Sequence, residues 1–103
     1  MHLVQIFLPL RDNHGRRIAA AHFERLSTDL IHRFGGMTAF AQSPATGLWK
    51  KTRRSAPERD QIVIYEVMVK RLQRRWWRQE RIRLEKIFRQ EQILIRVMAI
   101  DRL

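Results

Sequence analysis

One stretch constrains the fold of this chain more than any other, residues Gln61–Val69, QIVIYEVMV. β-branched and aromatic side chains fill most of its positions. This is typical of a strand, and a run this apolar has to be covered on both faces. Glu66 is the exception, because an ionised carboxylate in such a strand needs a partner, a ligand or water. The stretch therefore predicts a strand at the centre of the fold and a polar contact at Glu66.

The length and composition allow a single domain over residues 1–103. A chain of this length builds an adequate but modest core, and an apolar content of 45% excludes a disordered chain. Cysteine is absent from the sequence, which excludes disulfides, thiolate catalysis and thiolate metal sites. No apolar run approaches the roughly 20 residues of a membrane span, and residues 1–10 lack the basic start of a signal peptide. We therefore expect a cytoplasmic protein.

Hydrophobic periodicity predicts four strands and two helices. Alternating side chains favour strands, and apolar residues at spacings of three and four favour helices. The expected strands are His2–Leu8, Met37–Gln42, Gln61–Val69 and Gln92–Ile100, and the expected helices are Ile18–Phe34 and Lys70–Gln90. Residues 47–50, Gly-Leu-Trp-Lys, either resume the second strand or form a short extra strand. Gly35 and Gly36 supply a stop signal for the first helix.

The resulting order, β-α-β-β-α-β, is that of a ferredoxin-like α+β domain. In this topology we expect a four-stranded antiparallel sheet with the spatial order fourth, first, third, second, and both helices on one face. One set of alternate residues is wholly apolar apart from a tyrosine hydroxyl and is expected under the helices: Val4, Ile6, Leu8, Val63, Tyr65, Val67, Ile93, Ile95 and Val97. The stripe Trp77, Leu84 and Phe88 of the second helix is expected to be buried with them.

The opposite face of the predicted sheet has no helix to cover it. It carries the other alternate residues of three strands: Leu3, Gln5, Phe7, Ile62, Ile64, Glu66, Met68, Leu94, Arg96, Met98 and Ile100. So much apolar area is not expected to remain in water. We therefore predict that a second copy covers it, sheet facing sheet, as in a homodimeric α+β barrel.

Three polar residues share that face, one from each of three neighbouring strands: Gln5, Glu66 and Arg96. A glutamate and an arginine bridged by an amide satisfy one another, which indicates a buried ion pair that fixes register or dimer geometry. A polar spot in an apolar interior is also the usual make-up of a pocket for a small polar or anionic ligand. An enzyme would use the same pocket, with Glu66 as general base and Arg96 orienting an anionic substrate. A register slip of one residue would void this grouping.

The chain also carries a large positive charge. Twenty-one lysines and arginines against ten acids give +11 and a pI near 11.6, which favours polyanionic partners such as nucleic acid. Residues 50–60, KKTRRSAPERD, are expected to form an exposed, mobile hairpin loop, and a cationic face runs along the second helix. The candidate phosphate contacts are Lys50, Lys51, Arg53, Arg54, Arg59, Arg71, Arg75, Arg78, Lys86 and Arg89. The alternative is a solvated basic surface without a partner.

The remaining motifs carry little chemistry. No two of the four histidines stand at a helical ligand spacing, and Asp29 with His32 is only a weak two-ligand pair, so neither a metal nor a cofactor is expected. His22 is expected to pack at the rim of the core, and Trp77 within it. An RNA-recognition motif would need aromatic residues on the open face of the third strand, which QIVIYEVMV does not supply.

Several short motifs lie along the chain: a Gly-Gly-x-Thr turn at residues 35–38, a Gly-x-Trp hairpin at 47–49, the stretch 58–69, and a Phe-x-Gln-Glu-x-x-Leu-Ile motif at 88–95. These motifs resemble those of a group of small, uncharacterised bacterial α+β proteins. Together they span most of the chain. The resemblance implies the fold of a dimeric α+β barrel, and it carries over no catalytic residue.

The sequence therefore predicts a homodimeric α+β-barrel module that binds a small polar or anionic ligand. Two alternatives stay open. One is non-sequence-specific binding of nucleic acid or another polyanion through the basic loop and helix face, and the other is a small-molecule enzyme that uses the barrel pocket.

Overall fold

The computed structural model describes residues 1–40, 45–49 and 58–103, with residues 45–49 and 58–60 described by their backbone alone. Its elements are β1 (His2–Pro9), α1 (Ala20–Phe34), β2 (Thr38–Ala39), β3 (Ala45–Trp49), β4 (Glu58–Val69), α2 (Arg74–Ile87) and β5 (Ile95–Ala99). The α+β class agrees with the prediction. Neither α1 nor α2, the helices of the described residues, is long and apolar enough to cross a membrane.

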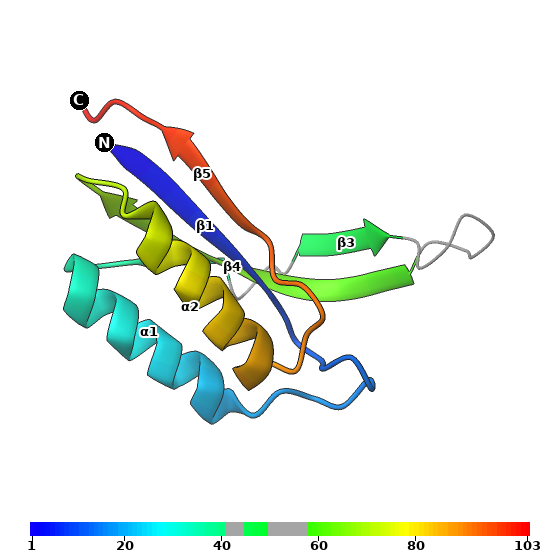
Figure 1. Ribbon diagram of the computed structural model, residues 1–103. Helices are drawn as coiled ribbons and strands as arrows, with labels where there is room; N and C mark the ends of the chain where they lie inside the picture. The colour runs from blue at the N-terminus through cyan, green and yellow to red at the C-terminus, as the bar shows by residue number, and fades with distance from the viewer. Residues whose placement is uncertain (41–44, 50–57) are drawn as a thin grey trace.

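The strands form one antiparallel sheet in the order β2-β4-β1-β5, and β3 also pairs with β4. Ile62 of β4 pairs with Pro9 of β1 and with Ala45 of β3, so β3 lies along the edge of β4 that faces away from β1. α1 and α2 lie side by side against one face of the sheet, and the described residues place no helix on the other (Figure 1). This arrangement is compatible with a ferredoxin-like fold.

Alternation along the strands divides the sheet into a covered face, under the helices, and an open face. The covered face holds the core. Its buried residues are Val4, Ile6, Leu8, Val63, Tyr65, Val67, Val69 and Ile93 from the sheet side, and Leu26, Leu30, Trp77, Leu84 and Phe88 from the helix side. The residues predicted under the helices all lie in this set except Val97 and Ile95, the second of which is half-buried against the core. Val97 is 36% exposed, because β5 is the last strand of the sheet. Burial raises the pKa of the Tyr65 hydroxyl.

Aromatic side chains fill the layer between the two helices. The ring of Phe34 stacks on Trp77 with centroids 5.4 Å apart, and Trp76 meets Trp77 edge-on at 4.8 Å. Phe23 packs edge-on against Phe88 at 5.1 Å, and the His22 ring lies 6.1 Å from the same phenylalanine. Trp77 is therefore a core residue, as predicted, and its ring faces are taken up by neighbouring rings.

The predicted loop over residues 50–60 is wrong at its C-terminal end, because β4 begins at Glu58. Residues 58–60 look like loop residues in the sequence, but β3 pairs with them, Trp49 opposite Glu58 and Leu48 opposite Arg59. Arg59 is thus a strand residue. The rest of that predicted loop, residues 50–57, lies outside the described residues. β3 is the short extra strand that the sequence left as an alternative. β2 has two residues, whereas six were predicted; two of those six, residues 41 and 42, lie outside the described part.

The starts of three other elements also differ from the prediction, and at two of them a local hydrogen bond competes with the predicted element. The N–H of Ile18 donates to the carbonyl of Leu10 at 2.9 Å, so α1 starts two residues late, at Ala20. The N–H of Ile93 donates to Glu85 Oε2 at 2.9 Å, which delays β5 until Ile95. α2 starts at Arg74 instead of Lys70, and its first turn still carries no acid, so Arg74 and Arg75 oppose the helix dipole there.

The two helices end in left-handed residues of different kinds. α1 ends at Gly35, with φ 83°, whose N–H donates to the Ile31 carbonyl at 2.8 Å. After α2 the left-handed residue is Arg89, with φ 51°. The N–H groups of Gln90 and Arg89 donate to the carbonyls of Glu85 and Lys86, at 2.9 and 3.3 Å, which is the Schellman pattern.

Candidate functional site

The three polar residues predicted on the open face meet there. In the register of the sheet, Gln5 of β1 stands opposite Glu66 of β4 on one side and Arg96 of β5 on the other. Gln5 Nε2 donates to Glu66 Oε1 at 2.5 Å, and Arg96 Nη2 donates to Gln5 Oε1 at 3.3 Å. The Arg96 guanidinium also lies 4.6 Å from the centroid of the Phe7 ring. The amide thus bridges the carboxylate to the guanidinium across three strands.

In this bridge the polar groups of the three side chains pair with one another. The amide of Gln5 uses one donor and its acceptor on charged neighbours, so the two charges are held by hydrogen bonds within the protein. The surrounding open face is apolar and exposed: Met68, Leu94 and Met98 are 49%, 54% and 43% exposed. This geometry favours the structural interpretation of the three residues over that of a ligand pocket.

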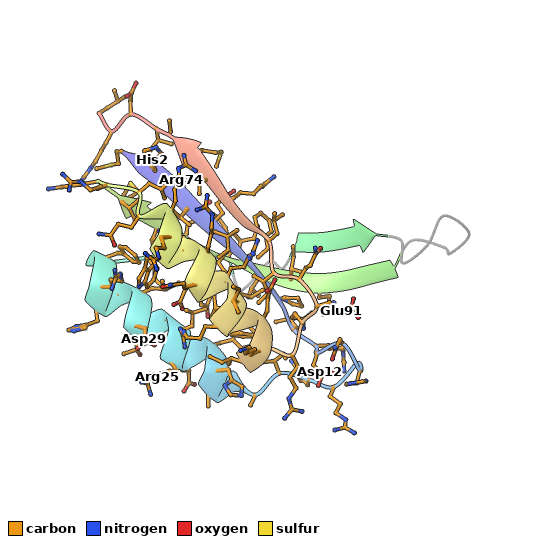
Figure 2. The ribbon with its side chains drawn as sticks, viewed as in Figure 1. His2, Asp12, Arg25, Asp29, Arg74 and Glu91 are labelled. Atoms are coloured by element: carbon orange, nitrogen blue, oxygen red, sulfur yellow. The ribbon has the colours of Figure 1, made fainter. Side chains whose placement is uncertain are left out.

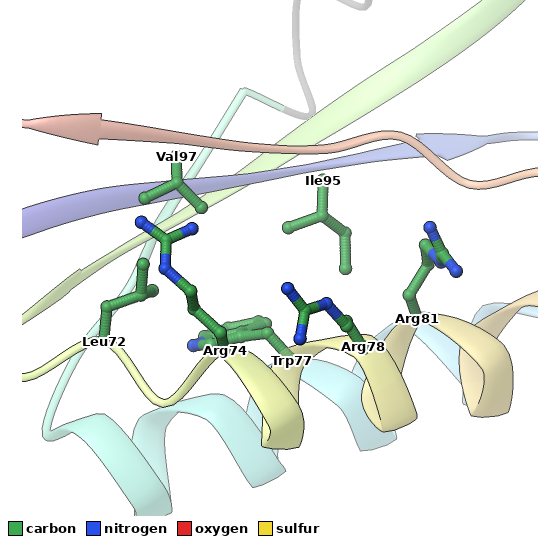
Figure 3. A pocket seen from close by; sticks show the side chains of 7 residues that line it. All are labelled: Leu72, Arg74, Trp77, Arg78, Arg81, Ile95 and Val97. Carbon is green, nitrogen blue, oxygen red and sulfur yellow. The ribbon is translucent and has the colours of Figure 1, made fainter.

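A groove lies elsewhere, on the helix side, between α2 and the edge strand β5. Its volume is about 130 Å³, and its lining is Leu72, Arg74, Trp77, Arg78, Arg81, Ile95 and Val97 (Figure 3). The floor is apolar and the rim is cationic. The guanidinium groups of Arg74 and Arg81 project from α2 toward β5, and the Arg78 side chain extends along α2 below Ile95 (Figure 3). Such a groove suits a ligand with carboxylate or phosphate groups beside an apolar part.

The sequence places the three arginines together through their spacing. Arg74, Arg78 and Arg81 stand four and three residues apart, so they share one side of α2, flanking the buried Trp77. Only Arg78 was among the predicted contacts. Arg74 and Arg81 were missed, although the spacing i, i+4, i+7 would have grouped all three.

The predicted polyanion contacts fall into three groups. Lys50, Lys51, Arg53 and Arg54 lie outside the described residues, and Arg59 is described only as a backbone position of β4. The remaining five, Arg71, Arg75, Arg78, Lys86 and Arg89, are exposed on α2 and its flanks. Exposed cations thus recur along α2 and at both of its ends.

The acids of α2 do not neutralise that surface. Glu80 is buried and is held by Arg83, whose Nε lies 3.1 and 3.2 Å from the two carboxylate oxygens. The hydrogen bond that Arg83 donates to Glu80 raises the pKa of the Arg83 guanidinium. Glu85 accepts the backbone N–H of Ile93. Both carboxylates are thus engaged by neighbours inside the fold, and the outer side of the helix is left cationic.

The loop between β1 and α1 is built around Asp12 (Figure 2). Its Oδ1 accepts the backbone N–H groups of His14 and Arg16, at 2.8 and 2.9 Å. The Arg16 N–H is the main reason that the pKa of the Asp12 carboxyl is lowered; burial acts in the opposite direction, and the His14 N–H adds to the lowering. Arg89 Nη1 lies 4.0 Å from Asp12 Oδ2, which ties this loop to the end of α2. The carboxylate is an anchor of the loop.

Comparison of the chain with protein-family models, with curated proteins and with solved structures finds no match. The resemblance noted in the Gly-Gly-x-Thr turn and the Gly-x-Trp hairpin therefore stays a prediction. Function has to be argued from the surfaces described above.

Proposed function

We propose that this protein binds polyanions, nucleic acid first among them, through the outer side of α2 and its flanks. One observation carries the proposal. The cations of this surface, Arg71, Arg75, Arg78, Lys86 and Arg89, are exposed, while the two acids of the helix are engaged elsewhere. A net charge of +11 adds a favourable long-range field.

The expected binding is indifferent to base sequence. Arginine contacts on a straight helix face suit phosphate oxygens, which fix position without carrying sequence information. The two tryptophan rings of α2 are engaged within the protein, since Trp77 is 5% exposed and packs on Phe34 and Trp76, and the Arg33 guanidinium lies 4.0 Å from the centroid of the Trp76 ring. Affinity should therefore depend on salt far more than on sequence.

The test is fluorescence anisotropy of labelled duplex DNA and RNA over a series of salt concentrations. We expect the logarithm of the binding constant to fall linearly with the logarithm of salt, by about 0.9 per duplex phosphate neutralised. The double variant Arg75→Glu/Lys86→Glu should weaken binding and reduce that slope by about two. The matched control, Arg25→Glu/Arg102→Glu, makes the same change in net charge away from α2. Absence of binding at physiological ionic strength, or equal losses in both variants, would contradict the proposal.

We further propose that two copies pair through the open faces of their sheets, as in a dimeric α+β barrel. The supporting observation is the apolar surface around Gln5, on which Met68, Leu94 and Met98 are about half exposed. Sedimentation equilibrium at micromolar concentration should give a dimer, and Met98→Glu should give a monomer, since it buries a charge without a partner. A monomeric unmodified protein would exclude this pairing.

The ligand-binding and enzymatic interpretations of Gln5, Glu66 and Arg96 depend on that dimer. Only a facing sheet would enclose the three side chains and exclude water from them. A small polar or anionic ligand in that interior, or a reaction with Glu66 as general base, is therefore a proposal secondary to the pairing itself. A monomer in the sedimentation experiment would remove both.

A further inference from the structure

β5 is the last strand of the sheet, and in the described part of the chain no strand pairs with its outer edge (Figure 1). The register shows which backbone groups point there. The N–H of Phe7 donates to the Leu94 carbonyl and that of Ile100 to the Met1 carbonyl, both at 3.0 Å. Bonded positions recur at every second residue of an antiparallel ladder. Residues 94, 96, 98 and 100 therefore face β1, and Ile95, Val97 and Ala99 turn their N–H and C=O groups outward.

The residues with outward backbone groups also have their side chains on the helix side. Ile95 and Val97 form part of the floor of the groove beneath Arg74, Arg78 and Arg81 (Figure 3). Arg74 stands near Val97 and Arg78 near Ile95, so α2 runs antiparallel to β5 along the groove. A row of open backbone groups thus lies beside a row of guanidinium groups.

We propose that this edge binds an extended acidic segment of a partner protein, which adds to the sheet as an antiparallel strand next to β5. The site consists of the outward backbone groups of Ile95 and Val97 together with Arg74, Arg78 and Arg81. Main-chain hydrogen bonds to β5 supply the affinity, and side-chain pockets on the two faces supply the selectivity.

The partner segment alternates carboxylates with aliphatic residues. Residues of an antiparallel pair that exchange backbone bonds project their side chains to the same face, so those opposite Ile95 and Val97 lie under the arginines. The alternate residues of the partner segment place their side chains on the open face, beside Leu94 and Met98, where an aliphatic side chain is favoured.

The spacing also fits. Arg74 and Arg78 are about 6 Å apart along the helix axis, and alternate residues of a strand are about 6.8 Å apart. Two successive carboxylates of the added strand therefore match Arg74 and Arg78. Arginine suits a carboxylate better than lysine does, because one guanidinium can bind both carboxylate oxygens.

The experiment uses a fluorescent peptide of alternating Glu and Val and the full-length protein. We expect saturable binding, with a Kd below about 100 μM at physiological ionic strength. A peptide of the same composition with the glutamates and valines in two blocks should bind at least about tenfold more weakly. Equal binding of the two peptides, or of neither, would overturn the proposal, since it requires alternation.

N-methylation separates strand addition from simple charge attraction. Methyl groups on the glutamate nitrogens remove the donors that face β5 and should abolish binding. Methyl groups on the valine nitrogens replace N–H donors that point away from β5, so most of the peptide binding should remain. Losses of the same size at both sets of positions would contradict the predicted orientation.

Protein variants separate this site from the polyanion surface. The variant Arg74→Gln/Arg81→Gln should bind the peptide about tenfold more weakly and bind duplex DNA with nearly unchanged affinity. The matched variant Arg75→Gln/Lys86→Gln should do the reverse, because these residues lie outside the groove. If both variants weaken both ligands equally, α2 offers one undivided cationic surface and the separate peptide site is wrong.

Discussion

The two faces of the sheet are made by the same strands, and they differ in what lies over them and in the polar residues that they carry. On the covered face Val4, Ile6 and Leu8 are completely buried by α1 and α2. On the open face Met68, Leu94 and Met98 are comparably apolar, yet each remains about half exposed. The difference shows that hydrophobicity alone does not decide burial in this fold. The position of the helices does, and the open face holds polar residues that the covered face does not tolerate.

The largest effect should come from the covered face. Ile6→Ala removes a fully buried side chain beneath two helices and should lower the free energy of unfolding by about 2–5 kcal/mol. Denaturant unfolding measures it. Met68→Ala on the open face is the control and should cost about 1 kcal/mol or less, since the side chain is already half in water. If the Met68→Ala cost grows with protein concentration, the open face is buried in a dimer.

A smaller effect is expected from the polar bridge of the open face. Gln5→Ala removes both hydrogen bonds that hold Glu66 and Arg96 and should cost about 1–2 kcal/mol, since both partners are charged but partly solvated. Gln79→Ala, at an exposed position of α2, is the matched control and should be neutral or slightly stabilising. A neutral Gln5→Ala would mean that water replaces the amide without loss.

The helices that cover the other face can be compared at their ends. Gly35→Ala puts a Cβ on a residue with φ 83° and should destabilise the protein by about 1 kcal/mol. Arg89→Gly should act in the opposite direction, with a smaller gain because the contact with Asp12 is lost. Thermal unfolding of both variants shows whether each substitution lowers or raises the melting temperature. A cost at both positions would show that the side chain of Arg89 outweighs its backbone strain.

The smallest effect concerns the loop that leads from β1 into α1. The pKa of Asp12 is lower in the folded state than its value of about 3.9 in unfolded chains, so its ionised form stabilises the fold. That contribution is present above the unfolded pKa and is lost as the pH falls through the folded pKa. Asp12→Asn should remove this part of the acid sensitivity. Melting temperatures of both proteins from pH 6 to pH 2 should converge at the acid end, and parallel curves would contradict the assignment.

Alternation and topology together predicted the Gln5–Glu66–Arg96 grouping. Each strand position has only two faces to choose from, and the β-α-β-β-α-β order places the three strands side by side. The sequence also indicated that the amide bridges the two charges, but it could not decide between this bridge and a ligand pocket, because that choice depends on rotamers and on distances of a few tenths of an ångström. The groove beside β5 was missed for a related reason, since it depends on how far α2 lies from the sheet edge.

Two local misreadings have the same physical origin. Glu80 was not expected in the core, yet it lies between Trp77 and Leu84 in the apolar stripe and is buried with Arg83 as its partner. Residues 58–60 have poor strand propensity, yet β3 pairs with them. In both places a contact from elsewhere in the fold overrides the preference of the residue.

The central position of β1 has a consequence for how the chain is made. Gln5 bonds to residues 61 and 91 positions further along the sequence, so both partner strands of β1 are synthesised long after it. At about 5–20 residues per second, β1 waits roughly 3–12 s for β4 and longer still for β5. During that time an apolar strand with two open edges is a template for the wrong pairing. Among the strands of the described residues, β1 is thus synthesised first and completed last, and its open edges favour aggregation of the nascent chain until β4 and β5 pair with it.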